Sequence, residues 1–275
     1  MDYNIKLANG KVLRGFISSP GEGVKAVIVF VHGLGEHILR YRSWAEMFTG
    51  NGIAFTGVDL PGHGNSDGKR GHIKSYNLTD EMIGILLNSV SMTFPSVPVF
   101  LYGQSLGGGI VLRYILAHEP DITGAIVTSP WLKLSFEPDK FKIFLASVMK
   151  NILPAFTQSS GLVIEHLSHN RDEVDKYGTD PLVHGKISVS LFYNALEAAK
   201  ESLEYSGRLK IPLLLMHGSD DKICSPEGSR IFASKEGPID FKIWEGGYHE
   251  LHNEMFRDDV FAYISGWINE KLNKK

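Results

Sequence analysis

The stretch that most constrains the fold of this chain is residues 97–109, which read VPVFLYGQSLGGG. Its first half is apolar and rich in β-branched and aromatic residues, a pattern that predicts a buried strand ending at Gly103. A helix-compatible segment begins just after Ser105 and continues to His118. The sequence therefore predicts that Ser105 lies on a sharp turn between a strand and a helix.

Glycines flank this serine at the two positions where such a turn needs them. Gly103 and Gly107 lie two residues before and after Ser105, where a side chain would collide with a neighbouring strand or helix. In this context the pattern Gly-x-Ser-x-Gly is typical of a nucleophile elbow, a turn that holds a reactive hydroxyl clear of the sheet. A glycine-rich turn with an idle serine is the alternative, and the flanking strand and helix favour the elbow.

Buried strands alternate with helices on both sides of the elbow. Continuous apolar runs at 26–31, 53–58, 122–128 and 211–217 are separated by segments with helical spacing, which predicts a parallel sheet with right-handed crossovers. Before them, two short alternating runs joined by an Asn-Gly turn within residues 4–17 predict an antiparallel hairpin. At 275 residues, 43% of them hydrophobic, the chain is expected to form a single α/β domain over its whole length, 1–275.

The alternation stops between Ser129 and about Glu204, where no clear strand is found. Residues 140–153 instead space apolar side chains at three and four residues, which predicts a helix with a broad apolar face. An excursion of this size between two sheet strands predicts an inserted helical cap, residues 130–204, over the active site. The apolar face has two interpretations: packing onto the main domain, or a wall that meets an acyl chain or a membrane surface.

Composition excludes several classes of partner. A net charge of −3 leaves no basic surface for nucleic acid. The single cysteine, Cys224, and the absence of an HExxH motif argue against an internal disulfide and a zinc site, so no metal and no cofactor are expected. Without a signal pattern or a long apolar run, we expect a cytoplasmic protein with at most a transient, peripheral membrane contact through the cap. Its oligomeric state stays open.

A serine hydroxyl becomes a good nucleophile only beside a base whose tautomer a carboxylate fixes. In α/β-hydrolases the three groups follow in the order Ser, Asp or Glu, His, each at the end of a strand. Here Ser105 is followed by the pair Asp220 and Asp221, and then by His249 and His252. The residues alone leave open which aspartate faces the base. His249 is nearer its strand end, in a glycine-rich turn.

The loop after the strand at 26–31 supplies the remaining part of a candidate site. It reads HGLGEH, and a glycine-bearing loop at this place can point a backbone N–H into the site. The N–H of Leu34 is our candidate, with the N–H of Leu106, the residue after the nucleophile, as the second. Together they would hold a developing oxyanion.

Motifs along nearly the whole chain carry a family resemblance. They are HGLGEHILRY at 32–41, DLPGHGNS at 59–66, GQSLG at 103–107, NRDEVDKY at 170–177 with DPL at 180–182, GSDDKIC at 218–224 and GYHELH at 247–252. These segments resemble the monoglyceride lipases of the α/β-hydrolase superfamily. The resemblance implies an α/β-hydrolase fold: a mostly parallel central sheet, an antiparallel N-terminal hairpin and a helical cap insertion.

The resemblance also implies an activity, the cleavage of monoacylglycerols to fatty acid and glycerol through an acyl-enzyme. The substrate partner would be a lipid-like small-molecule ester. A lysophospholipase or a broad short-chain carboxylesterase is the alternative among enzymes. The alternative from another class is a hydrolase-fold protein that binds a ligand without converting it.

Matched position by position, the resemblance implies that the acid is Asp221, that the base is His249, and that Leu34 and Leu106 are the oxyanion donors. It further implies a polar, glycerol-binding end of the site lined by four side chains: Glu36, Arg40, Tyr177 and His252. At Gln104 the chain departs from the family, which usually has histidine before the nucleophile. Glutamine can donate and accept hydrogen bonds but cannot titrate, so we expect Gln104 to alter head-group recognition.

Overall fold

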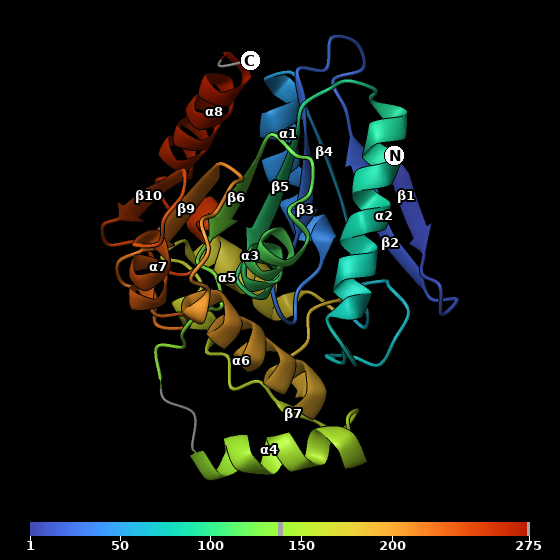
Figure 1. Ribbon diagram of the computed structural model, residues 1–275, viewed down its shortest axis with the longest axis vertical. Helices are drawn as coiled ribbons and strands as arrows, with labels where there is room; N and C mark the ends of the chain where they lie inside the picture. The colour runs from blue at the N-terminus through green and yellow to red at the C-terminus, as the bar shows by residue number, and fades with distance from the viewer. Residues whose placement is uncertain (137–139, 274–275) are drawn as a thin grey trace.

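The computed structural model describes residues 1–136 and 140–273, so part of the expected cap and the last two residues of the chain lie outside the described part. Eight strands of these residues form one sheet in the order β1-β2-β4-β3-β5-β6-β9-β10 (Figure 1). Their bounds are β1 Asp2–Lys6, β2 Val12–Ser18, β3 Ala26–Val31, β4 Ile53–Val58, β5 Val99–Gln104, β6 Gly124–Thr128, β9 Leu213–Gly218 and β10 Ile239–Trp244.

Strand direction agrees with the sequence prediction. The N-terminal strands β1 and β2 form an antiparallel hairpin, and β2 pairs antiparallel with β4. All the other neighbours in this sheet run parallel. The predicted hairpin and the mostly parallel sheet are therefore confirmed.

Helices cover both faces of the sheet, which explains why its central strands are apolar throughout. Along β3, Val27 and Val29 belong to one core cluster, whereas Ile28 and Phe30 belong to the other. The second cluster includes side chains of α1 (Arg42–Gly50) and α8 (Arg257–Asn273). The first includes side chains of four helices: α2 (Asn77–Thr93), α3 (Leu106–His118), α6 (Val189–Glu204) and α7 (Pro226–Ala233).

The chain between β6 and β9 leaves the sheet and forms an insertion. Within its described residues are α4 (Lys140–Ile152), η2 (Ile164–His166), α5 (Arg171–Thr179) and α6. Contrary to the expectation of no strand, β7 (Thr157–Ser159) and β8 (Lys186–Ser188) pair antiparallel. Each has only three residues, too few to show the alternation of polar and apolar side chains by which a strand is recognised in a sequence.

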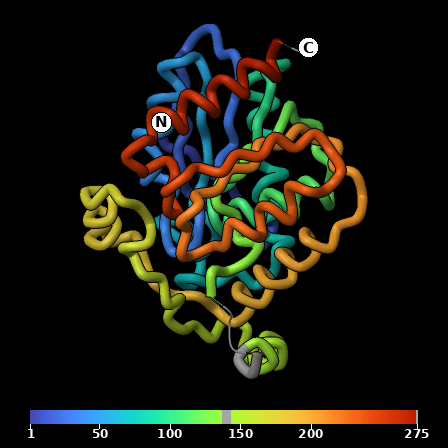
Figure 2. Tube along the Cα trace, turned by 90° about the vertical axis from the view of Figure 1, so that its left-hand side faces the viewer, coloured from blue at the N-terminus to red at the C-terminus, as the bar shows by residue number. Residues whose placement is uncertain are grey.

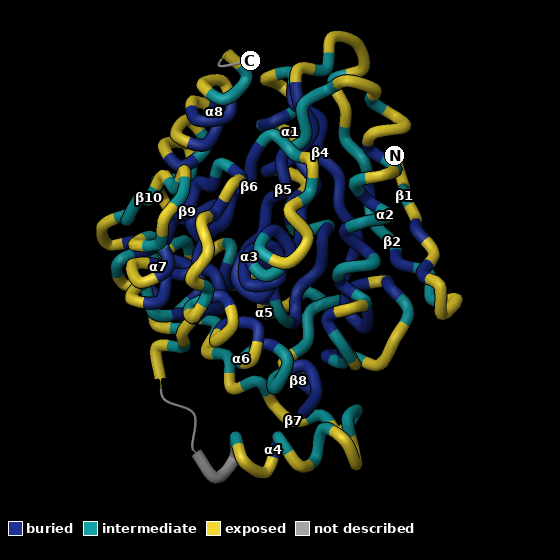
Figure 3. Tube along the Cα trace, in the orientation of Figure 1, coloured by how far each residue is buried: buried dark blue, intermediate teal, exposed yellow. Residues whose placement is uncertain are grey.

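Helix α4 forms the outer edge of the insertion. Figures 1 and 2 show it at the end of the molecule opposite the C-terminus, and it contacts α6. The apolar residues of its described part, 143–152, stay largely exposed, with exposed fractions of 63% for Phe144 and 69% for Ile152, and among them only Ala146 is buried (Figure 3). Packing against the main domain is therefore the wrong interpretation for most of this face. No helix of the described residues is long and apolar enough to cross a bilayer.

Candidate active site

Ser105 occupies the turn between β5 and α3 with a backbone conformation that few residues adopt. Its φ is 55° and its ψ is −118°, in the region that normally favours glycine. A Cβ on Gly103 would lie 2.4 Å from the carbonyl oxygen of Gly107, and a Cβ on Gly107 would lie 2.1 Å from the carbonyl oxygen of Val31. The predicted reason for both glycines, close approach of backbone to backbone, is confirmed.

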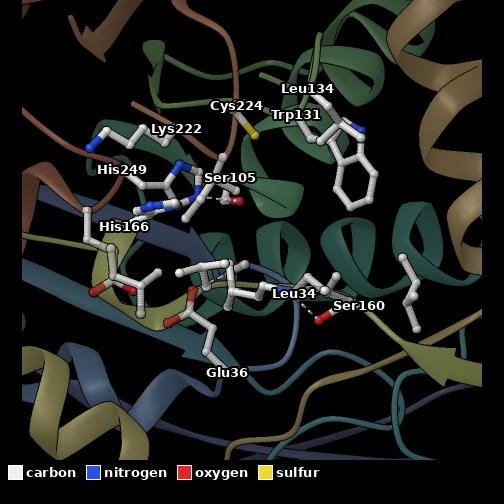
Figure 4. A pocket seen from close by; sticks show the side chains of 18 of the residues that line it. Leu34, Glu36, Ser105, Trp131, Leu134, Ser160, His166, Lys222, Cys224 and His249 are labelled. Atoms are coloured by element: carbon white, nitrogen blue, oxygen red, sulfur yellow. Dashed lines mark hydrogen bonds between the residues drawn. The ribbon is translucent and has the colours of Figure 1, made fainter. Parts of the chain in front are cut away.

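Two further strand ends bring an imidazole and a carboxylate to this serine. His249, in the loop after β10, has its Nε2 2.8 Å from Ser105 Oγ, and its Nδ1 lies 2.7 Å from Asp221 Oδ2 in the loop after β9. All three side chains are buried, and Figure 4 shows Ser105 and His249 pointing toward each other. Because Nδ1–H donates to the carboxylate, Nε2 is free to accept the hydroxyl proton.

The neighbouring aspartate that the sequence left as an alternative lies elsewhere. Asp220 is exposed and accepts a hydrogen bond of 2.6 Å from Ser219 Oγ. Of the two adjacent carboxylates, the structure therefore brings only Asp221 to the imidazole. Adjacent residues of a loop point in different directions, so one of them had to face away.

Asp221 is held ionised by its neighbours. Burial opposes ionisation, but His249 and the hydrogen bonds from His217 and His249 hold the pKa of Asp221 well below its ordinary value. Its Oδ1 also accepts from the backbone N–H groups of Ile223 at 2.8 Å and Cys224 at 3.0 Å. A carboxylate with this many donors stays an acceptor at neutral pH.

His217, the fifth residue of β9, is a part of this site that the sequence reasoning missed. Its Nε2 lies 3.0 Å from Asp221 Oδ2, and its Nδ1 lies 2.7 Å from Ser229 Oγ. Because the carboxylate can only accept, Nε2–H of His217 donates to Asp221. The signal in the sequence was a histidine four residues before the carboxylate, at the end of an otherwise apolar strand.

The charge environment favours the protonated form of His249. Burial by itself lowers the pKa of an imidazole, but the carboxylate of Asp221 outweighs burial, with smaller contributions from Glu250 and Glu36. The pKa of His249 is therefore raised above its ordinary value. A base with a raised pKa accepts a proton from a hydroxyl more readily.

Backbone N–H groups border the same space. Leu106 is the first residue of α3, and the first N–H groups of a helix have no partner within the helix. Leu34 lies in the loop after β3, and Leu34 and the preceding Gly33 line the cavity described below. Glu36 Oε1 accepts the N–H of Gly33 at 2.6 Å, which fixes this loop. Leu106 directly follows the candidate nucleophile and Leu34 lines the cavity beside it, so their N–H groups stay our predicted oxyanion donors.

A cavity of about 610 Å³ opens beside Ser105, within the usual size range of ligand pockets. Apolar side chains contributed mainly by the insertion form one part of its wall, among them Trp131, Leu134, Leu162, Val163, Ile187 and Phe192. Polar side chains also line it, among them Glu36, Gln104, His166, Tyr177, Lys222 and Glu250. Figure 4 shows Trp131 and Leu134 on one side of Ser105 and Glu36 on the other.

Arg40, expected at the polar end, does not line the cavity and lies behind two residues that do. It forms two hydrogen bonds of 2.8 Å with Glu250 and a further one with Glu36. Its guanidinium lies 4.6 Å from the ring centroid of Tyr177. Glu250 was missed by the sequence reasoning, because nothing in a loop sequence shows that a glutamate is buried against an arginine 210 residues away.

His252 also lies away from the cavity wall, although the resemblance implied a place for it there. It belongs to η3 (Leu251–Asn253) and its ring packs 4.7 Å from the ring of Tyr41 and 6.1 Å from that of Trp44, measured between centroids. Burial lowers the pKa of His252 to about 3. It is therefore a neutral, aromatic-packed histidine behind the polar end.

The cavity contains one thiol. Cys224 is buried and lies close to Ser105 (Figure 4), and burial raises the pKa of its thiol well above the ordinary value. A thiol with a raised pKa stays protonated and is a poor nucleophile.

As for metals, no group of three or more His, Cys, Asp or Glu side chains that could hold an ion occurs within residues 1–136 and 140–273.

An elbow serine, an imidazole and a carboxylate at the ends of parallel strands define the serine hydrolases of the α/β class. A family model described as serine aminopeptidase, S33, matches residues 22–255 of the chain. The monoglyceride lipase of Rattus norvegicus is 30% identical, over 96% of this chain and 89% of that protein. The chain belongs to this family of hydrolases, and the resemblance to monoglyceride lipases found in its motifs is confirmed.

Two further comparisons agree. The crystal structure of a monoacylglycerol lipase from Paleococcus ferrophilus superposes with a TM-score of 0.86 at 33% identity, covering 94% of this chain and 99% of that one. An uncharacterized abhydrolase domain-containing protein of Dictyostelium discoideum is 34% identical over 90% of this chain. The matched segment makes up only 26% of that longer protein.

Proposed function

We propose that the protein hydrolyses monoacylglycerols to fatty acid and glycerol through an acyl-enzyme. The observation that carries the proposal is the contact of 2.8 Å between Ser105 Oγ and His249 Nε2 at the wall of a cavity with an apolar and a polar part. Relatives that match most of the chain at about 30% identity are named monoglyceride lipases, which supports this substrate class.

In the first half of the reaction, Ser105 Oγ attacks the ester carbonyl while His249 Nε2 accepts the hydroxyl proton. Asp221 keeps the imidazole in the required tautomer and stabilises the imidazolium. The N–H groups of Leu34 and Leu106 donate to the oxyanion of the tetrahedral intermediate, and each contributes about 3 kcal/mol. The carbon–oxygen bond to glycerol then breaks, and glycerol takes the proton from His249.

The second half repeats these steps with water. His249 Nε2 accepts a proton from a water molecule that attacks the acyl carbonyl of the acyl-enzyme. The same two N–H groups hold the second oxyanion. When the bond to Ser105 Oγ breaks, the fatty acid is released and His249 returns the proton to the serine. The ester and one water molecule are the only reactants that the two halves consume, and the proton taken from Ser105 in the first half is replaced by one from water in the second.

The substrate is expected to lie with its acyl chain against the apolar wall and its glycerol against Glu36, Tyr177 and Glu250. We assign residues 130–204 as the cap, because their described part supplies most of this apolar wall. Arg40 contributes to the polar end from behind, through Glu36 and Glu250. His252 lies one contact further back, against Tyr41, whose hydroxyl donates to Glu36 at 2.8 Å.

The exposed face of α4 is assigned to a transient contact with a membrane surface. Phe144, Leu145 and Ile152 are 63%, 43% and 69% exposed on one helix of the cap. An exposed apolar helix face of this kind is typical of segments that lie in a lipid interface. A contact there would bring the cap, and with it the cavity, toward lipid substrates.

The activity is tested by offering the purified protein a panel of monoacylglycerols, diacylglycerols and lysophospholipids of varied acyl length. We expect the highest kcat/KM for a monoacylglycerol and covalent labelling by a fluorophosphonate. A clear preference for a lysophospholipid would contradict the assignment of the polar end to glycerol. Absence of both labelling and hydrolysis would leave a ligand-binding protein instead.

A further inference from the structure

Gln104 lies directly before the candidate nucleophile and binds the backbone of the candidate base. It is the last residue of β5 and is 1% exposed. Its Nε2 donates a hydrogen bond of 3.1 Å to the main-chain carbonyl oxygen of His249. Ser105 Oγ contacts the ring of the same histidine at 2.8 Å. Two consecutive residues of one strand end therefore hold His249, one by its ring and the other by its backbone.

The partners of the Gln104 amide fix its orientation. A backbone carbonyl can only accept, so the amide nitrogen must face His249. The amide oxygen then accepts the hydroxyl of Thr128, which stands opposite Gln104 in the parallel pair of β5 and β6. The result is a buried chain of hydrogen bonds from Thr128 through Gln104 to His249.

The segment that contains His249 depends on such contacts, because it lies between β10 and η3, outside any strand or helix. On either side of His249, the N–H of Glu250 donates to the carbonyl of Leu167 in the insertion at 2.8 Å, and the N–H of Tyr248 donates to Glu254 Oε1 at 2.8 Å. Neither bond connects the loop to the strand that leads into the serine. The bond from Gln104 does, because it connects the main chain of His249 to the residue next to Ser105.

We propose that Gln104 is a positioning residue, which holds the His249 backbone in register with the elbow so that Nε2 stays within reach of Ser105 Oγ. This inference rests on the proposed roles of Ser105 and His249. It differs from the head-group role expected from the sequence, because the amide oxygen and one amide N–H are directed at the protein itself. Its loss should therefore slow every ester alike, whatever the alcohol that leaves.

The test compares Gln104→Met and Gln104→Glu with the parent on p-nitrophenyl acetate and on a monoacylglycerol. Rates are expressed per active site, counted from the final extent of fluorophosphonate labelling. Methionine keeps the length but removes the donor, so kcat should fall about fivefold to tenfold on both esters, the range set by one net hydrogen bond. KM should stay within about twofold, because the amide groups that are replaced bind His249 and Thr128.

Glutamate keeps the shape and places an acceptor against the carbonyl, so its kcat should be lower than that of the methionine variant. Its added carboxylate also stabilises the imidazolium of His249. The acid limb of its pH profile should therefore move to higher pH, whereas that of the methionine variant should not move. A purely structural role of Gln104 would lower thermal stability and leave kcat per labelled active site at the parental value on both esters.

Thr128→Val is the matched control at the other end of the chain of hydrogen bonds, since it keeps the side-chain shape and removes only the hydroxyl. We expect it to lower kcat on both esters by less than Gln104→Met does. If Gln104→Met does not fold, Thr128→Val decides, and unchanged kcat on both esters would overturn the inference.

Two results with folded Gln104→Met would also overturn it: full activity on both esters, or a raised KM confined to the monoacylglycerol. The second result would make Gln104 a head-group ligand. Failure of the proposed function is distinguishable, because it would appear as a parent protein that neither cleaves esters nor takes the fluorophosphonate label.

Discussion

The strand-end loops and helix α4 differ in how they hold their side chains: those of the loops are buried and hydrogen-bonded, and those of α4 are exposed. Ser105, Asp221 and His249 follow three different strands and are buried. Hydrogen bonds of 2.7 Å to Asp221 and 2.8 Å to Ser105 connect His249 to the other two. On α4, by contrast, Phe144 and Ile152 keep 63% and 69% of their side-chain surface exposed. Chemistry at the loops depends on a fixed geometry, whereas α4 presents an exposed apolar face, for which we propose a membrane surface as the partner.

The largest expected effect is at the buried strand-end loops, on the candidate nucleophile. Ser105→Ala should lower kcat by about a million-fold, because without the hydroxyl the imidazole and the oxyanion donors have no nucleophile to assist. The measurement is steady-state hydrolysis of a monoacylglycerol and of p-nitrophenyl acetate. A Ser105→Ala protein that cleaves either ester at the parental rate would remove the basis of the proposed function.

The next effect separates two adjacent carboxylates. Asp221→Asn should lower kcat by about ten-thousand-fold, because an amide in this position favours the wrong tautomer of His249. Asp220→Asn is the matched control, since Asp220 is exposed and bonded to Ser219, and it should keep nearly full activity. Equal losses in the two variants would contradict the assignment of the acid to Asp221.

The pH dependence follows from the raised pKa of His249. The imidazole must be neutral to accept the serine proton, so kcat/KM should fall as pH drops through a pKa above the ordinary 6.5. Because the carboxylate of Asp221 is what raises this pKa, the residual activity of Asp221→Asn should keep its plateau to lower pH. Both profiles are measurable with a p-nitrophenyl ester. An acid limb below pH 6.5 in the parent would show that burial outweighs the carboxylate.

The smallest effect on chemistry is expected at α4. Phe144→Ser combined with Ile152→Ser should leave kcat/KM on p-nitrophenyl acetate unchanged and shift stability by no more than about 0.5 kcal/mol, as for other exposed sites. The same variant should bind lipid vesicles less in a co-sedimentation assay. Ile231→Ser on α7, 41% exposed, is the control and should bind as the parent does. Unaltered vesicle binding by the α4 variant would contradict a membrane role for this face.

Most of the fold could be predicted because it depends on local pattern. The buried strands appear as apolar runs, and the glycines around Ser105 are required because a Cβ at Gly103 or Gly107 would lie only 2.4 or 2.1 Å from a backbone carbonyl oxygen. The strands β7 and β8 escaped prediction because three residues carry no periodicity. The position of α4 escaped it because an apolar face looks the same in a sequence whether or not a neighbour covers it.

For the site, the sequence predicted which strand ends carry the functional residues, but not the direction or the contacts of every side chain. Which of Asp220 and Asp221 faces the base depends on side-chain direction within a loop, and the residues alone do not encode it. His217 and Glu250 were missed for a related reason, since each acts through a partner that only the folded chain brings near. The resemblance placed Arg40 at the cavity wall. Its hydrogen bonds to Glu36 and Glu250 instead hold it behind these two residues.

The positive φ of Ser105 has a consequence for heat resistance. A non-glycine residue in this conformation costs about 1–3 kcal/mol of folding free energy. Glycine adopts the conformation without that cost and loses only about 0.4–1 kcal/mol through a more disordered unfolded chain. The inactive Ser105→Gly protein should therefore have a melting temperature no lower than that of the parent. The strained backbone at Ser105 serves reactivity at the expense of stability.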